Sequence, residues 1–272
     1  MSQKQESRMR SLLQKHEIWV FFALIIVANT VFIFAIHEGH LPFKLYNTGR
    51  FLLLGAVLVA VVALSRGFGG VTSLLAPLTR WRVSPAWYLF AALWAVSLCS
   101  VFVIVHAAVT GSWPEAFAPG LETMLQPSVF RTVLIGALIG EIVWVSYAFA
   151  RLAPQLGTIV TALVVGTVWT GWWVPIAIMN VGVIPDLPLV ALWINMIGIA
   201  LVCGIVYGHT RSGLLVLLLQ FGVNSSIVVF PVSPSTGGIS VYWAFSIAYL
   251  AAALLLLMLW PPRPTPAFGE KH

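Results

Sequence analysis

The chain has 272 residues, of which 60% are hydrophobic and only 8% are charged. Soluble globular domains carry about 25% charged residues, so this composition excludes a soluble fold and predicts a polytopic membrane protein whose first partner is the lipid bilayer. The net charge is +6, but it does not indicate a nucleic-acid partner, because the basic residues flank apolar runs and form no patch interleaved with exposed aromatic residues.

The first 17 residues are polar and basic, and an apolar run follows them at 18–36. This run is longer than the core of a signal peptide and has no small-residue cleavage site after it, so we expect no cleavable signal. We interpret residues 1–17 as a cytoplasmic basic tail or an interfacial helix. Residues 261–272 form a second predicted cytoplasmic tail.

Eight apolar runs, some only with their flanks, reach the about 20 residues that a spanning helix needs. The runs cover residues 18–36, 51–65, 87–109, 129–150, 157–179, 188–208, 212–230 and 239–260. They predict an all-α bundle of about eight transmembrane helices between residues 18 and 260. The second run is short, and Pro175 offers a point at which the fifth could break.

The basic residues predict the orientation of this bundle. With the N-terminus in the cytoplasm, eleven of the 14 Lys and Arg residues lie on the inner side, and only Lys44, Arg50 and Arg131 lie on the outer side or its helix ends. Cytoplasmic loops are enriched in Lys and Arg, so we expect both termini in the cytoplasm and the protein in the plasma membrane. The inner segment 66–86 is rich in glycine, and we expect an interfacial helix there.

Glu141 is the only acidic residue in the middle of a predicted span. It lies twelve residues after Val129, which is about 18 Å along a helix. Its i+3 and i+4 neighbours are Trp144 and Val145, so its own helix supplies no countercharge. Ionisable residues inside a membrane are costly and are functional candidates by default.

Polar partners for Glu141 are available in the seventh run. Gln220 and Asn224 are four residues apart and therefore share one face of a helix. We expect them to donate hydrogen bonds to Glu141 across the helix interface; the alternative is that they only hold helices together. In the fifth run, Trp172 and Trp173 precede Pro175, either as binding residues or as an ordinary interfacial belt.

No metal or cofactor site is predicted. The six histidines lie in tails, in loops or at helix ends, and none forms the HExxH pair that a zinc protease uses. The stretch IHEGH at 36–40 has the wrong spacing for one helix face. The two cysteines, Cys99 and Cys203, lie inside apolar runs and indicate neither a disulfide framework nor a CxxC site.

Four stretches of this sequence together carry a family resemblance. They are RWRVSPAWY (80–88), GEIVWVSYAFARL (140–152), VGTVWTGWWVP (165–175) and HTRSGLLVLLLQFGVN (209–224). Their order and spacing resemble the CPBP family of CAAX-protease and bacteriocin-processing-like intramembrane proteins, over about residues 66–229. The resemblance implies a CAAX-protease-like bundle and an intramembrane metalloprotease ancestry, with motifs EExxxR, a His in a W-x-x-W-H-x-P context and HxxxN.

Most of the family's chemical groups are replaced in this chain. The first Glu of the pair is Gly140 and the second remains as Glu141, whereas the arginine is Val145. The two motif histidines are Trp173 and Gln220, and the asparagine remains as Asn224. The resemblance therefore implies a catalytically degenerate member, a pseudoprotease. In it, Glu141 and Asn224 are remnants of the catalytic set, and Trp144, Trp172, Trp173 and Gln220 are candidate binding residues.

Three functions follow as expectations. The first is a non-enzymatic membrane protein, of the bacteriocin-immunity kind, that holds a hydrophobic or prenylated peptide or a membrane partner. The second is an active intramembrane endopeptidase of the CAAX or peptide-processing type that uses Glu141, and only this function would call for zinc. The third is a transporter or channel subunit, although the sequence shows no second charge in mid-membrane and no inverted repeat.

Overall fold

The computed structural model describes residues 3–111, 117–184 and 186–262, and these form helices with no strand among them. The α-helices are α1 (Gln3–His37), α2 (Tyr46–Arg66), α3 (Phe68–Ser73), α4 (Pro85–Thr110), α5 (Phe117–Leu125), α6 (Pro127–Gly140), α7 (Ala150–Ile178), α8 (Leu189–Thr210), α9 (Gly213–Val229), α10 (Pro234–Gly237) and α11 (Ile239–Leu259). Two 3-10 helices, η1 (Phe43–Leu45) and η2 (Ala76–Thr79), and a π-helix, η3 (Glu141–Phe149), complete the chain. The predicted all-α membrane bundle is confirmed.

Seven helical stretches of the described chain are long and apolar enough to cross a membrane, and one of them, Pro127–Ile178, has 52 residues. A straight helix of that length would measure about 78 Å, more than twice the hydrocarbon core of about 30 Å. Gly157, with φ 73° and ψ 168°, interrupts it. The stretch therefore supplies two crossings, as the fourth and fifth predicted runs require. The helix breaks at Gly157, and it continues through Pro175.

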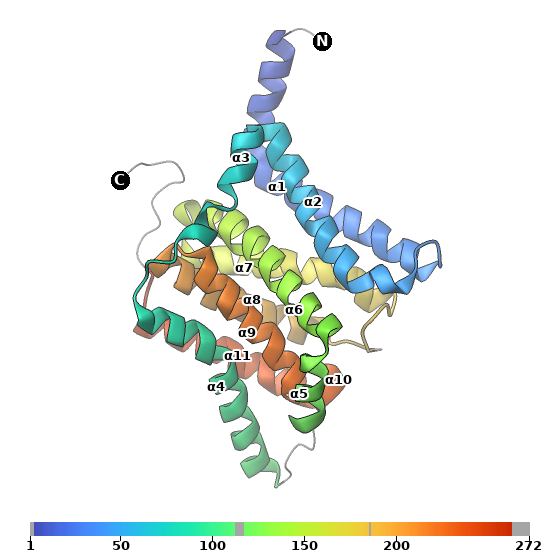
Figure 1. Ribbon diagram of the computed structural model, residues 1–272, viewed down its shortest axis with the longest axis vertical. Coiled ribbons are helices and arrows are strands. Elements are labelled where there is room, and N and C mark those ends of the chain that lie inside the picture. Colours follow the sequence, from blue (N-terminus) through green and yellow to red (C-terminus); the bar gives the residue numbers. More distant parts are fainter. Residues whose placement is uncertain (1–2, 112–116, 185, 263–272) are drawn as a thin grey trace.

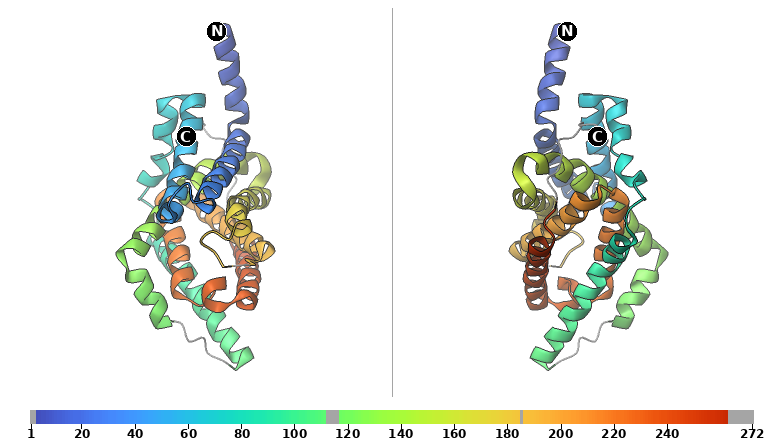
Figure 2. Two further views of the ribbon diagram at one scale, coloured as in Figure 1. Left: turned by 90° about the vertical axis from the view of Figure 1, so that its right-hand side faces the viewer. Right: turned by 90° about the vertical axis from the view of Figure 1, so that its left-hand side faces the viewer.

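Helix α8 lies at the centre of the bundle. It packs against α7, α11, α9 and η3, and every residue from Asn195 to Tyr207 is buried. Helices α1 and α2 form a pair beside α7 and α6, and α4 packs against α9 (Figure 1). The N-terminal end of α1 and the C-terminal end of α4 project from opposite ends of the molecule (Figure 2). The peripheral helices expose many large apolar side chains, which suits contact with lipid.

Helix α1 crosses the boundary that the sequence placed after residue 17. Glu17 is buried in this helix, and its carboxylate lies 2.7 Å from Arg66 Nε and 3.6 Å from Arg151 Nε. The hydroxyl of Ser65 also donates to it. A buried carboxylate needs such partners, and Arg66 at the end of α2 and Arg151 at the start of α7 provide them. The residue that looked like part of a solvated tail is thus a junction between α1, α2 and α7.

Candidate functional site

A cavity of about 280 Å³ lies inside the bundle. Its walls come mainly from α6, η3, α7, α8 and α9, with further residues from α2 and α11. Five of the six predicted site residues line it: Trp144, Trp172, Trp173, Gln220 and Asn224. These residues come from three separate stretches of sequence, so the fold brings together the groups that the sequence singled out.

Aromatic rings form much of the cavity wall. Trp144 of η3 and Trp169 of α7 stack at 5.4 Å between ring centroids, and Trp172 meets Trp173 edge to face at 5.8 Å. Phe51 of α2 contacts Trp172 from the other side. Residues 169, 172 and 173 share one helix face because they are three and four positions apart. The tryptophan cluster therefore faces the interior of the bundle and is not an interfacial belt.

Four N–H groups on the cavity-lining side chains have no hydrogen-bond partner among the described residues. They are Nε1 of Trp172, Nε1 of Trp173, Nδ2 of Asn195 and Nε2 of Gln220. Asn195 is 1% exposed and Gln220 is 2% exposed. A buried donor without a partner costs about 1–3 kcal/mol. The cavity wall thus holds four buried donors, which a ligand with oxygen acceptors would satisfy if these side chains turned toward it.

Asn195 was missed by the sequence analysis, although it lies in the cavity wall. It is the only amide of α8 and stands six residues after the helix begins at Leu189. An amide at membrane depth is itself a signal, because such a group must find a polar partner or a cavity. Two amides on one helix face are a stronger signal than a single amide, so Asn195 was not among the predicted residues.

Glu141 does not line the cavity. It is 0% exposed and begins the π-helix η3, and its Oε1 accepts a hydrogen bond from the hydroxyl of Ser146, five residues later. The i→i+5 geometry of a π-helix brings this residue within reach, where α-helical spacing pointed to Trp144 and Val145. The predicted bonds from Gln220 and Asn224 are wrong: neither amide reaches Glu141 in the described structure, and Gln220 Nε2 and Glu141 Oε2 each lack a partner there.

The start of helix α9 lies against the carboxylate of Glu141. A Cβ added to Gly213, the first residue of α9, would lie 2.6 Å from Glu141 Oε1 and 3.1 Å from Cβ of Pro77. Only glycine therefore allows this approach. The N-terminus of a helix carries a partial positive charge, so the dipole of α9 partly stabilises the negative charge of Glu141.

Gly140 and Gln220 meet at the cavity wall. A Cβ at position 140 would lie 2.6 Å from Gln220 Oε1, so the amide occupies the space beside the glycine. Both residues line the cavity. A larger residue at 140 would have to displace the side chain of Gln220.

A buried cation, Arg50, lies behind the tryptophan wall. It is 2% exposed, and its guanidinium carbon lies 3.8 Å from the ring centroid of Trp172 and 4.9 Å from that of Trp173. It donates to Asn29 Oδ1 at 3.3 Å and to the carbonyl of Trp172 at 3.4 Å. Arg50 was predicted to lie among the outer flanking charges, whereas the fold buries it between α1, α2 and α7.

Metal ligands do not gather at the cavity or elsewhere in the described part of the chain: no three His, Cys, Asp or Glu side chains lie close enough together to hold an ion. The site is defined instead by aromatic faces and amide groups. Comparison with known proteins assigns no family, because no protein-family model and no curated protein matches the chain.

Proposed function

We propose that this integral membrane protein is a binding protein that holds a hydrophobic peptide segment in the cavity between α6, η3, α7, α8 and α9. The observation that carries the proposal is the set of four unpaired N–H donors in an aromatic wall. A peptide offers a row of backbone carbonyl acceptors between apolar side chains. Its carbonyls would pair with the donors, and its side chains would pack on the tryptophan rings.

We also propose that the chain is a catalytically degenerate member of the CPBP family. The support is positional. Gly140, Trp173, Gln220 and Asn224 stand where the family motifs have a Glu, two His and an Asn, and all four line the one cavity. Convergence of these positions is what descent from a common catalytic site would produce. The groups now present are a glycine, an indole and two amides, which suit binding better than hydrolysis.

The endopeptidase function is less well supported. Peptide hydrolysis needs an activated water and stabilisation of an oxyanion, each of which contributes several kcal/mol. Glu141 is the carboxylate that this function requires, yet it lies outside the cavity lining and is bonded to Ser146. A peptide in the cavity would contact amides and indoles in place of this carboxylate.

The peptide proposal is tested by photo-crosslinking. A benzophenone amino acid replaces Trp169, and the cells are irradiated with ultraviolet light. It should crosslink to a defined hydrophobic peptide, which mass spectrometry identifies. Asn195→Leu with Gln220→Leu should lower the capture at least fivefold and yet raise the melting temperature of the empty protein, because two unpaired amides are removed. The exposed Gln155→Leu is the matched control and should leave both readouts unchanged.

Three other results would contradict the proposal. Capture of lipid alone would show that the cavity holds no peptide, and captured peptides that are cut within the bound segment would favour the endopeptidase. Capture that is unaffected by Asn195→Leu with Gln220→Leu would show that the amide donors do not recognise the ligand.

We propose that the protein lies in the plasma membrane and that both of its termini face the cytoplasm. The support is that Arg66 and Arg151 meet at Glu17, while Ser212, beside Arg211, donates a hydrogen bond to the backbone carbonyl of Arg80. Single cysteines in a Cys-free background test it. Cysteines at Glu122 and Ser235 should react with an impermeant thiol reagent in whole cells, and cysteines at Thr79 and Gln155 should react only after the membrane is opened.

A further inference from the structure

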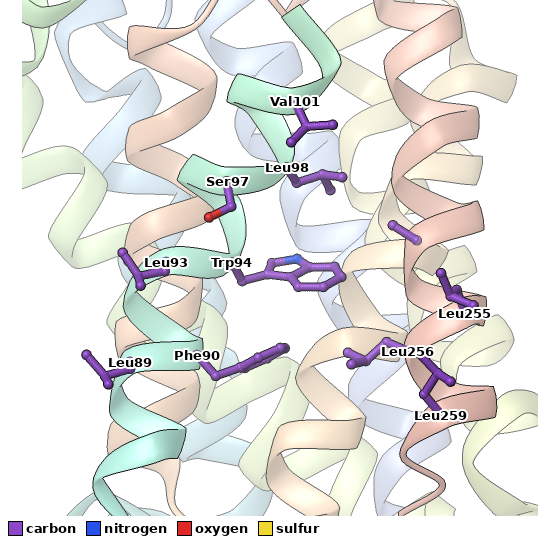
Figure 3. A pocket seen from close by; sticks show the side chains of 11 residues that line it. Leu89, Phe90, Leu93, Trp94, Ser97, Leu98, Val101, Leu255, Leu256 and Leu259 are labelled. Atoms are coloured by element: carbon purple, nitrogen blue, oxygen red, sulfur yellow. The ribbon is translucent and has the colours of Figure 1, made fainter. Parts of the chain in front are cut away.

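An apolar groove of about 480 Å³ runs between α4 and α11 on the outside of the bundle. Side chains of the two helices face one another across it, with Phe90 and Trp94 on one side and Leu256 on the other (Figure 3). Leu93 and Leu255 also line it. Trp94 projects between the helices, and its indole N–H donates to the hydroxyl of Tyr249 at 3.1 Å. In a membrane this groove faces lipid.

The groove has the length of one leaflet. Its lining on α4 runs from Leu89 to Val101, which is about 18 Å at 1.5 Å per residue. Half of a hydrocarbon core of about 30 Å is about 15 Å. One extended acyl chain would therefore fit along it.

The groove leads to a hollow that contains an arginine. This hollow is lined by Trp81, Arg82, Val83, Pro85 and Tyr88. Pro85 and the groove residues Leu89 and Leu93 are spaced by four, so they lie on one face of α4. The apolar groove and the polar hollow are consecutive parts of one surface.

Positive charge gathers at this end of the groove. The hydroxyl of Ser212 donates to the backbone carbonyl of Arg80 at 2.6 Å, which ties the loop before α4 to the junction that carries Arg211. Burial lowers the pKa of Arg211, and the nearby charge of Arg80 lowers it further, against the opposing effect of Tyr207. Neither Arg80, Arg82 nor Arg211 pairs with a carboxylate in the described parts of the chain. An anion held here would relieve the repulsion.

Aromatic residues complete the mouth of the groove. Trp87 of α4 stacks on His209 at 5.1 Å and lies 6.0 Å from Trp260, which follows the end of α11. Trp81 is 60% exposed. Tryptophan is enriched at the headgroup level of membranes, so the mouth of the groove stands where lipid headgroups lie.

We propose that the α4–α11 groove and the arginine loop beside it form one binding site for an anionic phospholipid. An acyl chain lies along Leu89, Leu93 and Leu255, and the phosphate is held by Arg82 with Arg80 and Arg211. Charge complementarity selects the lipid, because basic pockets at helix ends bind anionic headgroups. This site is separate from the interior cavity, and its test does not depend on the peptide proposal.

The test uses the full chain in nanodiscs that contain equal amounts of dioleoyl phosphatidylglycerol and dioleoyl phosphatidylcholine. After release from the nanodiscs, native mass spectrometry counts the lipids that stay bound. Phosphatidylglycerol should be retained at least fivefold over phosphatidylcholine. Arg80→Gln with Arg82→Gln should remove that preference, and the exposed Arg131→Gln, at the start of α6, should keep it.

The groove is tested by filling it. Leu93 and Leu255 are more than half exposed, so Leu93→Trp and Leu255→Trp should fold normally and each lower the retained phosphatidylglycerol at least fivefold. Equal retention of the two lipids in the unmodified protein would overturn the proposal. An equal loss of the preference for phosphatidylglycerol in Arg131→Gln would also overturn it. If inorganic phosphate displaces the lipid and neither tryptophan substitution lowers its retention, the site binds a bare anion and the proposal is wrong.

Discussion

Two buried charges, Arg50 and Glu141, lie within the membrane-spanning helices, and neither has an oppositely charged partner among the described residues. Arg50 bonds to α1 and α7 and stacks on Trp172. Glu141 bonds only within its own π-helix and touches the first turn of α9. A buried charge can thus be held by aromatic faces, carbonyls and a helix dipole. The arginine connects three helices, whereas the glutamate is bonded only locally, through Oε1.

The largest effect is expected for Arg50→Leu. It removes a cation–π contact of about 2 kcal/mol and leaves the Asn29 carbonyl oxygen without its donor. We expect a loss on the order of 3 kcal/mol in the free energy of unfolding, because hydrogen bonds to a charged group contribute about 1.5–3 kcal/mol. Thermal melting in detergent, followed by intrinsic tryptophan fluorescence, measures it.

The control for this substitution is Arg131→Leu, since Arg131 is an exposed arginine in another helix. It should change the melting temperature by a small fraction of the Arg50 effect. Equal melting temperatures for the two variants would show that Arg50 is not a structural connector.

The fold was predictable from the sequence to the level of the spanning helices, because apolar length alone decides which segments cross a bilayer. The break at Gly157 falls at the boundary between the fourth and fifth predicted runs. The possible break at Pro175 is absent, because α7 continues through this residue. The continuation of α1 past Glu17 also depends on distant residues. Arg66 and Arg151 neutralise Glu17, and they lie far along the chain.

The cavity-lining residues were predictable where α-helical spacing places them on one face of a helix. Gln220 and Asn224, four apart, and Trp172 and Trp173 in the next-but-one helix all reach the cavity. Glu141 was assigned to the same network because its i+3 and i+4 neighbours offer no polar partner, whereas in the π-helix its carboxylate accepts a hydrogen bond from Ser146, five residues later. The sequence carries no clear mark of the π-helix.

The contact between α9 and Glu141 gives the next prediction. Gly213→Ala would put a Cβ 2.6 Å from Glu141 Oε1 and 3.1 Å from Cβ of Pro77. Overpacking of this kind costs about 1–3 kcal/mol, which should lower the melting temperature. Gly69→Ala is the matched control, because nothing lies within 4 Å of the added methyl group.

Relief of that crowding identifies its cause. Glu141→Ala removes the carboxylate, so adding Gly213→Ala to it should cost less than Gly213→Ala alone. Equal costs in the two backgrounds would mean that the added methyl group collides with Pro77 or the backbone and that Glu141 is not its main neighbour.

A smaller effect is expected from the hydrogen bond inside the π-helix. A double-mutant cycle of Glu141→Leu with Ser146→Ala should show a coupling of about 1 kcal/mol, because the two side chains are bonded. The same cycle of Glu141→Leu with Asn224→Leu should be additive, because no hydrogen bond joins that pair in the described structure. Coupling in the second cycle and additivity in the first would show that Glu141 bonds to Asn224 across the helix interface and not to Ser146.

The smallest effect is expected for Glu141→Gln, and it separates the two buried charges most sharply. The amide oxygen still accepts from Ser146, so only the attraction of the carboxylate to the α9 dipole is lost, which amounts to about 0.3–1 kcal/mol. Arg50→Lys keeps the charge of Arg50 but loses the planar stacking on Trp172 and part of its forked bonding, so it should cost more than Glu141→Gln. Melting curves of the two variants, measured side by side, test this order.

Because Glu141 lies outside the cavity lining, Glu141→Gln should also leave peptide capture at Trp169 unchanged. If it abolishes biological activity while stability and capture stay intact, the carboxylate acts as an acid or a base, and the protein is an enzyme.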